Sequence, residues 1–167
     1  HLIRRDGLAP SYLPPIVSQF HDITTLEQLE EFAKVWAPTL QTGDLVTLSG
    51  ELGAGKTTFV KALVGVLGGE PNDVQSPTFS ILHHYRAVPA VIHIDAYRLE
   101  GVEDAMRAGI QDVLASEGPD SITFVEWPEK VPSLWGPVTA HVTLGEVEDA
   151  ETQKKQRILT VESSFTS

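Results

Sequence analysis

The sequence predicts an α/β fold with a mainly parallel central sheet, antiparallel additions at the sheet edges and helices on both faces. Two observations support this class. An apolar, β-rich run at residues 45–48 is followed by a glycine-rich turn and a helical pattern over residues 56–67, which together make half of a β–α–β unit. Two further β-rich runs, residues 79–86 and 90–95, flank a short break and predict an antiparallel hairpin.

The first helix is expected to begin at Thr24 or Thr25. Thr25 and Gln28 have capping-box spacing, in which each side chain satisfies a backbone N–H at the start of the helix. Pro38 is expected to kink or end this helix. One apolar face follows at helical spacing and consists of Leu29, Phe32, Ala33 and Trp36.

The helix over residues 56–67 should stop at the glycine pair 68–69. Residues 102–115 predict one short helix broken at Gly109, and residues 122–125 predict a buried strand. The last two strands are expected at residues 138–144 and 156–161, joined by a solvated acidic turn at residues 145–151.

A chain of 167 residues has the length of one domain. Residues 1–20 carry three prolines and no periodicity, so we expect an irregular N-terminal arm there. Residues 21–162 are expected to form a single domain, and residues 163–167 a C-terminal tail.

Composition excludes several classes of protein. Twelve Lys and Arg against 23 Asp and Glu give a net charge of −11, which disfavours independent binding to a phosphate backbone. The absence of cysteine excludes a disulfide scaffold, a thiolate zinc site and a thiol nucleophile. No apolar stretch reaches the roughly 18 residues of a membrane-spanning helix, so we expect a cytoplasmic protein without membrane contact.

The turn between residues 45–48 and 56–67 has the pattern G-x-x-x-x-G-K-[ST] over residues 50–57, which predicts a P-loop NTPase fold. Glycines allow backbone N–H groups to curl around an anion, and the following helix directs its positive end toward the same anion. Lys56 would reach the β- and γ-phosphates, and the Thr57 hydroxyl would bind Mg²⁺. The expected nucleotide-binding residues are Glu51, Leu52, Gly53, Ala54, Gly55, Lys56, Thr57 and Thr58.

Two carboxylates follow apolar strands, where open α/β sheets bind ligands. Glu126 would bind Mg²⁺ directly or through water, and its alternative is an ordinary surface carboxylate. Asp95 would polarise the attacking water or hold a metal-bound water, and its alternative is a cap for the next turn. His93 alternates with apolar residues, which favours a place in the core over a ligand role.

Two other residues near these strands have two interpretations each. Thr78, after Ser76-Pro77, is either a loop hydroxyl that senses the γ-phosphate or a turn residue. Trp127 is either a core residue, which is the default, or a mobile lid over the nucleotide.

Four motifs in order resemble those of the bacterial TsaE (YjeE) family. They are Gly50–Thr57, Ser76-Pro77-Thr78-Phe79, His93–Leu99 and Glu126-Trp127-Pro128-Glu129. The resemblance covers residues 22–162. It departs at Ala96, where the family more often has leucine, and it does not extend to residues 1–20.

The resemblance implies a small P-loop ATPase with ATP and Mg²⁺ as cofactors, required for threonylcarbamoyl-adenosine formation at position 37 of tRNA. Its implied partner is a TsaB–TsaD-type protein complex, which would contact the tRNA in its place. The matching Glu126 is a metal-site residue in the family, and Thr24 or Thr25 would touch the nucleotide base. Arg157 would either contact the nucleotide or lie at a sheet edge without a functional contact.

The expected mechanism is slow, Mg²⁺-dependent ATP hydrolysis with Lys56, Asp95 and Glu126 as the catalytic residues. An arginine finger would come from Arg98 or from a partner. One rival is a small-metabolite kinase, although only one arginine, Arg157, follows the presumed metal strand to serve a kinase lid. Another rival is a non-catalytic, nucleotide-sensing adaptor.

Overall fold

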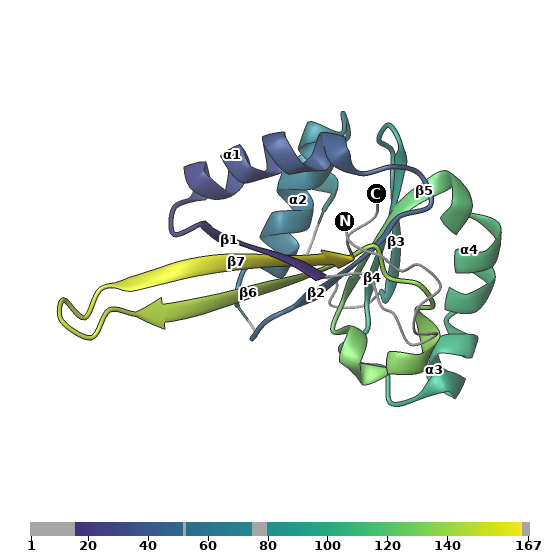
Figure 1. The fold of residues 1–167 in the computed structure, drawn as a ribbon. Helices are drawn as coiled ribbons and strands as arrows, with labels where there is room; N and C mark the ends of the chain where they lie inside the picture. Colours follow the sequence, from purple (N-terminus) through teal and green to yellow (C-terminus); the bar gives the residue numbers. More distant parts are fainter. Residues whose placement is uncertain (1–15, 52, 75–79, 165–167) are drawn as a thin grey trace, which may run out of the picture.

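The computed structural model describes residues 16–51, 53–74 and 80–164. Within them, a seven-stranded sheet has the order β1-β7-β6-β2-β5-β4-β3, and helices cover both of its faces (Figure 1). The strands are β1 (Ile16–Asp22), β2 (Leu45–Ser49), β3 (Leu82–Tyr85), β4 (Ala90–Asp95), β5 (Ser121–Glu126), β6 (Ala140–Glu148) and β7 (Lys155–Ser164). The helices are α1 (Leu26–Trp36), α2 (Lys56–Val66), α3 (Val102–Arg107) and α4 (Ile110–Ser116). Short 3₁₀ turns are η1 (Ala37–Thr39), η2 (Pro71–Asp73), η3 (Gly118–Asp120), η4 (Pro128–Lys130) and η5 (Pro132–Leu134).

The four central strands run parallel. β2 pairs with β6 on one side and with β5 on the other, and β5 pairs with β4, all in parallel register. β3 is antiparallel to β4 at one edge, while β7 and β1 are antiparallel additions at the other. The predicted fold, a P-loop NTPase fold with a mainly parallel sheet and antiparallel additions, is therefore confirmed.

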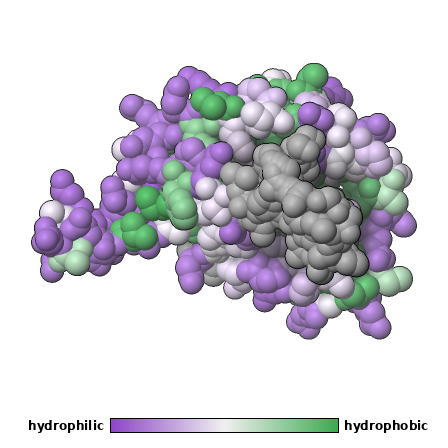
Figure 2. Space-filling view, in the orientation of Figure 1, coloured by the Kyte–Doolittle hydropathy of each residue, from purple (hydrophilic) through white to green (hydrophobic). Residues whose placement is uncertain are grey.

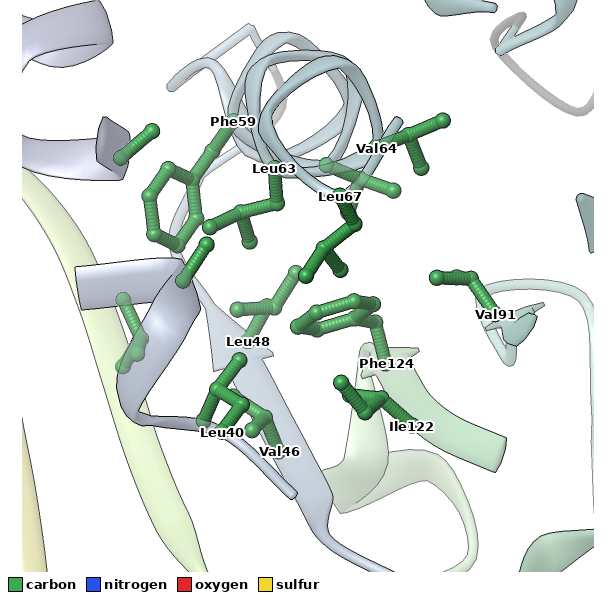
Figure 3. Packing of buried hydrophobic residues seen from close by; sticks show 14 of the residues in the cluster. Leu40, Val46, Leu48, Phe59, Leu63, Val64, Leu67, Val91, Ile122 and Phe124 are labelled. Carbon is green, nitrogen blue, oxygen red and sulfur yellow. The ribbon is translucent and has the colours of Figure 1, made fainter. Parts of the chain in front are cut away.

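One hydrophobic core lies between the sheet and helices α1 and α2. Phe59 and Leu63 of α2 face Leu48 of β2 and Phe124 of β5, and all four side chains are fully buried (Figure 3). Strands buried on both faces are apolar in nearly every position, and β2 and β5 follow this rule. This packing fixes α2, and with it the loop that enters α2, against the sheet.

A second core covers the opposite face. Ile92 and Ile94 of β4 pack there with Leu99 and with Ile110 of α4. Gly109 has a φ of +77° between α3 and α4, so the predicted break at this glycine is confirmed. Val91 of β4 belongs to the first core, so the two faces of this strand supply the two cores, as the two-residue period of a strand requires.

Helix α1 begins as predicted. The Thr25 hydroxyl accepts a hydrogen bond from the Gln28 N–H at 3.1 Å, and the Gln28 side chain accepts one from the Thr25 N–H at 2.9 Å. The helix passes into the 3₁₀ turn η1 at Ala37, beside Pro38. Both local signals therefore act as their chemistry predicts.

The prediction of an irregular segment up to residue 20 is wrong for residues 16–20, which belong to β1. β1 pairs along its length with β7, whose residues lie about 140 positions later in the chain. β7 likewise continues to Ser164, beyond the expected domain end at residue 162. Pairing with a distant segment creates this edge of the sheet, and no local pattern in residues 16–20 predicts the strand.

Residues 145–148 are also strand rather than turn. They extend β6, and Glu148 pairs with Lys155 of β7, so the turn is confined to residues 149–154. Lys155 lies 3.8 Å from Glu146, an opposite-charge cross-strand contact that suits an exposed ribbon. The hairpin projects from the body of the domain (Figure 1), and its far end is mainly hydrophilic (Figure 2).

The expected strand at residues 79–86 is shorter in the structure, where β3 spans Leu82–Tyr85. No helix among the described residues is long and apolar enough to cross a membrane.

The anchoring of α2 can be tested by Leu63→Ala. We expect the free energy of unfolding to fall by about 2–5 kcal/mol, because the fully buried side chain leaves a cavity under the helix. The same substitution at Leu26, which is 59% exposed, should change it by about 0.5 kcal/mol or less. Urea denaturation measures both. Equal losses for the two variants would contradict the assigned packing.

Candidate functional site

The parallel register brings two carboxylates beside the glycine loop. Leu48 of β2 pairs with Glu126 at the end of β5, and Glu126 pairs with Asp95 at the end of β4. The loop at residues 50–55 continues directly from β2. The carboxyl ends of three parallel strands thus deliver the loop, Glu126 and Asp95 to one edge of the sheet, the usual position of ligand sites in open α/β sheets.

Two glycines in the loop are required by its shape. Gly50 has a φ of +152°, and a Cβ there would lie 2.6 Å from the Leu144 carbonyl oxygen. Gly55 has a φ of +101° and is the N-cap residue of α2. A side chain at either position would push the loop away from the sheet or strain it. The first N–H groups of α2 have no acceptor within the helix and are directed out of its N-terminus.

Lys56 lies under the loop and is only 5% exposed. Its Nζ donates hydrogen bonds to the carbonyl oxygens of Gly50 at 2.6 Å and Glu51 at 3.0 Å. The Nζ also lies 4.4 Å from the centroid of the Trp127 ring, a cation–π contact. Burial lowers the pKa of Lys56, and the charges of Glu126 and Asp95 act in the opposite direction. The structure therefore places the Lys56 ammonium group beneath the glycine loop.

Thr57 and Glu126 are in direct contact. The Thr57 hydroxyl donates to Glu126 at 3.1 Å from Oε2 and 3.4 Å from Oε1, and Glu126 is only 3% exposed. The alternative of an ordinary surface carboxylate is therefore wrong, because the sheet register turns this strand end inward. Glu126 Oε2 also lies 2.5 Å from Nε2 of His93. His93 is fully buried, as expected, but it contacts the site as well as the core.

Hydroxyl and carboxylate oxygens are suitable ligands for Mg²⁺, and Thr57 and Glu126 present both within contact distance. No three His, Cys, Asp or Glu side chains gather as a metal cage in the described part of the chain. A magnesium ion that enters with a nucleotide needs only one or two protein oxygens, since phosphates and water complete its shell. The donor set therefore fits a nucleotide-bound Mg²⁺.

Asp95 is half-buried at the same edge. Its Oδ1 accepts a hydrogen bond from the Tyr97 N–H at 2.9 Å, so the alternative role given above, a cap for the next turn, is present in the structure. Burial raises the pKa of Asp95, with a smaller contribution in the same direction from the charge of Glu126. The turn cap is compatible with a catalytic role, because the second carboxylate oxygen can still accept a proton or hold a water molecule.

A small pocket joins the loop to the start of α1. Its volume is about 110 Å³, and its lining includes Thr24, Thr25, Gly55, Thr58 and Arg157. The Thr24 hydroxyl accepts a hydrogen bond from the Arg157 N–H at 3.1 Å, which ties β7 to this corner. Thr24 and Thr25, expected at the nucleotide base, therefore lie together with Arg157 beside the loop, although they come from opposite ends of the chain.

Three other predicted residues are not placed at the site by the described structure. Leu52 and Thr78 lie outside the described residues, and Arg98 is exposed. The sequence did not predict that Trp127 contacts both Lys56 and Tyr97. The Tyr97 ring is tilted against the Trp127 ring, and their centroids lie 4.9 Å apart. Trp127 has a φ of +57°, an uncommon conformation that re-aims the chain just after Glu126. No pattern in the sequence signals such a conformation for tryptophan.

Comparison with known proteins gives a consistent result. The family model described as "Threonylcarbamoyl adenosine biosynthesis protein TsaE" matches residues 23–158. The tRNA threonylcarbamoyladenosine biosynthesis protein TsaE of Rickettsia conorii is 34% identical over 125 residues, covering 74% of this chain and 69% of that protein. The protein of the same name from Streptomyces coelicolor is 44% identical over 107 residues, covering 60% and 68%.

A crystal structure of YdiB from Bacillus subtilis superposes with a TM-score of 0.63 at 24% sequence identity. The match covers 93% of this chain and 90% of that one. At this identity the likeness establishes the fold alone.

The burial of Asp95 predicts a pH-dependent effect of Asp95→Asn. Because the pKa of Asp95 is raised in the folded state, its favourable contribution is present below the unfolded pKa, near 3.8, and is lost as pH rises through the folded pKa. The Asn variant avoids this loss. We therefore expect its Tm advantage over the parent to be larger near pH 7 than near pH 4, as measured by thermal denaturation.

Asp112→Asn, at an exposed position, reports the general effect of removing one negative charge from this acidic chain. A Tm difference for Asp95→Asn that is the same at both pH values, or the same as that of Asp112→Asn, would contradict a burial penalty at Asp95.

Proposed function

The chain belongs to the TsaE family of threonylcarbamoyl adenosine biosynthesis proteins, and we propose that it binds ATP with Mg²⁺ and hydrolyses the ATP in support of tRNA threonylcarbamoyladenosine formation. The observation that supports this proposal most strongly is the contact between Thr57 and Glu126 beside the buried Lys56. These three side chains combine metal-binding oxygens with a fixed positive charge at the mouth of a P-loop. Phosphoryl transfer needs this combination more than it needs a covalent catalyst.

The loop residues bind the triphosphate in this proposal. The N–H groups at the start of α2 donate hydrogen bonds to the negative phosphate oxygens, and the positive end of the helix dipole attracts the same oxygens. Two of the three donors of Lys56 go to the carbonyls of Gly50 and Glu51, which fixes its ammonium group, and a phosphate oxygen can take the third. Burial excludes competing water and strengthens each of these electrostatic contacts.

Thr57 and Glu126 would hold the magnesium ion, and when bound that ion neutralises charge on the β- and γ-phosphates. Asp95 lies next to Glu126 in register and has a raised pKa, which suits a group that accepts a proton from water or holds water in place. In this proposal the pocket lined by Thr25 and Arg157, which lies beside the loop, contacts the nucleotide base.

Hydrolysis is expected to be slow in the isolated protein and to be stimulated by a TsaB–TsaD-type complex. The described residues near the loop offer Arg157, at the base pocket, but no arginine in contact with Thr57 or Glu126, so a partner is the natural source of further positive charge. The net charge of −11 supports a division of labour in which the partner complex contacts the tRNA.

The proposal is tested with Lys56→Met and Glu126→Gln, which keep the size of each side chain and remove its charge. We expect Lys56→Met to lower ATP turnover by roughly 100-fold, because a preorganised charge at the transferring phosphoryl group is lost. Glu126→Gln should lower the tightening of ATP binding by Mg²⁺ by at least about tenfold. Phosphate release, with and without the partner complex, and calorimetric titration measure these effects.

Lys61→Met and Glu129→Gln are the matched controls, since both side chains are exposed, Lys61 on α2 and Glu129 in η4. They should retain turnover and the magnesium effect. Parent-like turnover in Lys56→Met would contradict the proposal. Loss of turnover in both site variants with intact tRNA modification would favour an adaptor whose nucleotide hydrolysis is dispensable.

A further inference from the structure

His93 connects the metal-ligand candidate to the interior of the domain. The ring is completely buried in the middle of β4. Its Nε2 lies 2.5 Å from Glu126 Oε2, and its Nδ1 lies 3.2 Å from the Tyr85 hydroxyl. With Thr57 on the other side of the carboxylate, four side chains form a continuous hydrogen-bonded chain from the neighbouring edge strand β3 to the P-loop helix.

The chemistry of the partners orders the protons in this chain. A carboxylate offers only acceptors, so Nε2 of His93 must carry the hydrogen that it shares with Glu126. In that tautomer Nδ1 is the acceptor, and the Tyr85 hydroxyl donates to it. Tyr85 thereby favours the Nε2–H tautomer, and Nε2–H of His93 donates a hydrogen bond to Oε2 of Glu126.

Packing keeps this donor in place. The rings of His83 and Tyr85 lie 6.0 and 5.9 Å from that of His93, centroid to centroid. His93 is also backed by parallel pairing of β4 with β5 on one side and antiparallel pairing with β3 on the other. Glutamate, by contrast, has three rotatable side-chain bonds, and a buried carboxylate without fixed partners can adopt other orientations.

We propose that His93 is a positioning residue that holds the Glu126 carboxylate against Thr57, so that the oxygen ligands for Mg²⁺ are assembled before the nucleotide arrives. The inference rests on the proposed function, and it adds a residue for which the sequence favoured a place in the core over a ligand role. Removing a group that hydrogen-bonds to a metal-binding carboxylate and orients it typically changes metal affinity or activity by about 10–100-fold.

The decisive comparison is between His93→Gln and His93→Asn. The Gln amide can place an N–H near the position of Nε2, whereas the shorter Asn amide cannot reach Glu126. The measured quantity is the factor by which Mg²⁺ tightens binding of a non-hydrolysable ATP analogue, taken from calorimetric titrations in magnesium and in EDTA. The Asn variant should lose about tenfold or more of this factor, the Gln variant should recover part of it, and magnesium-free affinity should stay within about twofold of the parent.

His84→Gln is the control, since His84 neighbours the site strand but is exposed and contacts Glu117. It should keep the magnesium factor of the parent. The ¹⁵N shifts of the His93 ring in the parent, read by NMR without nucleotide, should report the Nε2–H tautomer. Neither readout requires turnover, and the tautomer is independent of overall stability.

Three outcomes overturn the inference. One is a parent-like magnesium factor in both His93 variants, and another is an Nδ1–H tautomer. The third is a loss of affinity for the ATP analogue that is equally large in EDTA and in magnesium, which would mark His93 as a structural residue only. A parent that binds no ATP analogue in either buffer would defeat the proposed function itself and the inference with it, whereas a parent that binds normally isolates the failure to His93.

Discussion

Parallel pairing of β2, β5 and β4 is the constraint on which the rest of the site depends. It places the end of each strand at the same edge of the sheet, so the P-loop, Glu126 and Asp95 arrive together without any loop having to fold over to meet them. The same register buries Phe124 under α2 and exposes Glu126 to Thr57 two residues later. A slip of one residue would exchange the faces of β5 and move the carboxylate to the opposite side of the sheet.

Charges buried at this edge are tolerated because they are arranged in contact with one another. Lys56 donates hydrogen bonds to carbonyls of the loop and lies over the Trp127 ring. Glu126 is hydrogen-bonded to Thr57 and His93. Isolated charges at such depth would be strongly disfavoured, whereas satisfied ones give a rigid, preorganised site. The raised pKa of Asp95 and the lowered pKa of Lys56 show that burial still acts against both charges, as is common where groups are held for chemistry rather than for stability.

The features that could be predicted from the sequence are those with local causes. The capping box at Thr25 and the glycine loop are readable because a few adjacent residues determine their geometry. β1 and the extension of β6 could not be read, since pairing with distant β7 creates them. The alternation of His93 with apolar residues predicted a buried ring, but only the register of β4 with β5 shows that His93 reaches Glu126. The left-handed backbone of Trp127 follows from tertiary packing and has no sequence signal.

The most direct test of the account is a crystal structure of the protein grown with a non-hydrolysable ATP analogue and magnesium. The account predicts the triphosphate in the curve of the loop, with a phosphate oxygen at hydrogen-bond distance from Lys56 Nζ and the metal adjacent to Thr57 and Glu126. A nucleotide bound elsewhere, with the Lys56 ammonium still held only by the Gly50 and Glu51 carbonyls and the Thr57 hydroxyl still donating to Glu126, would contradict it.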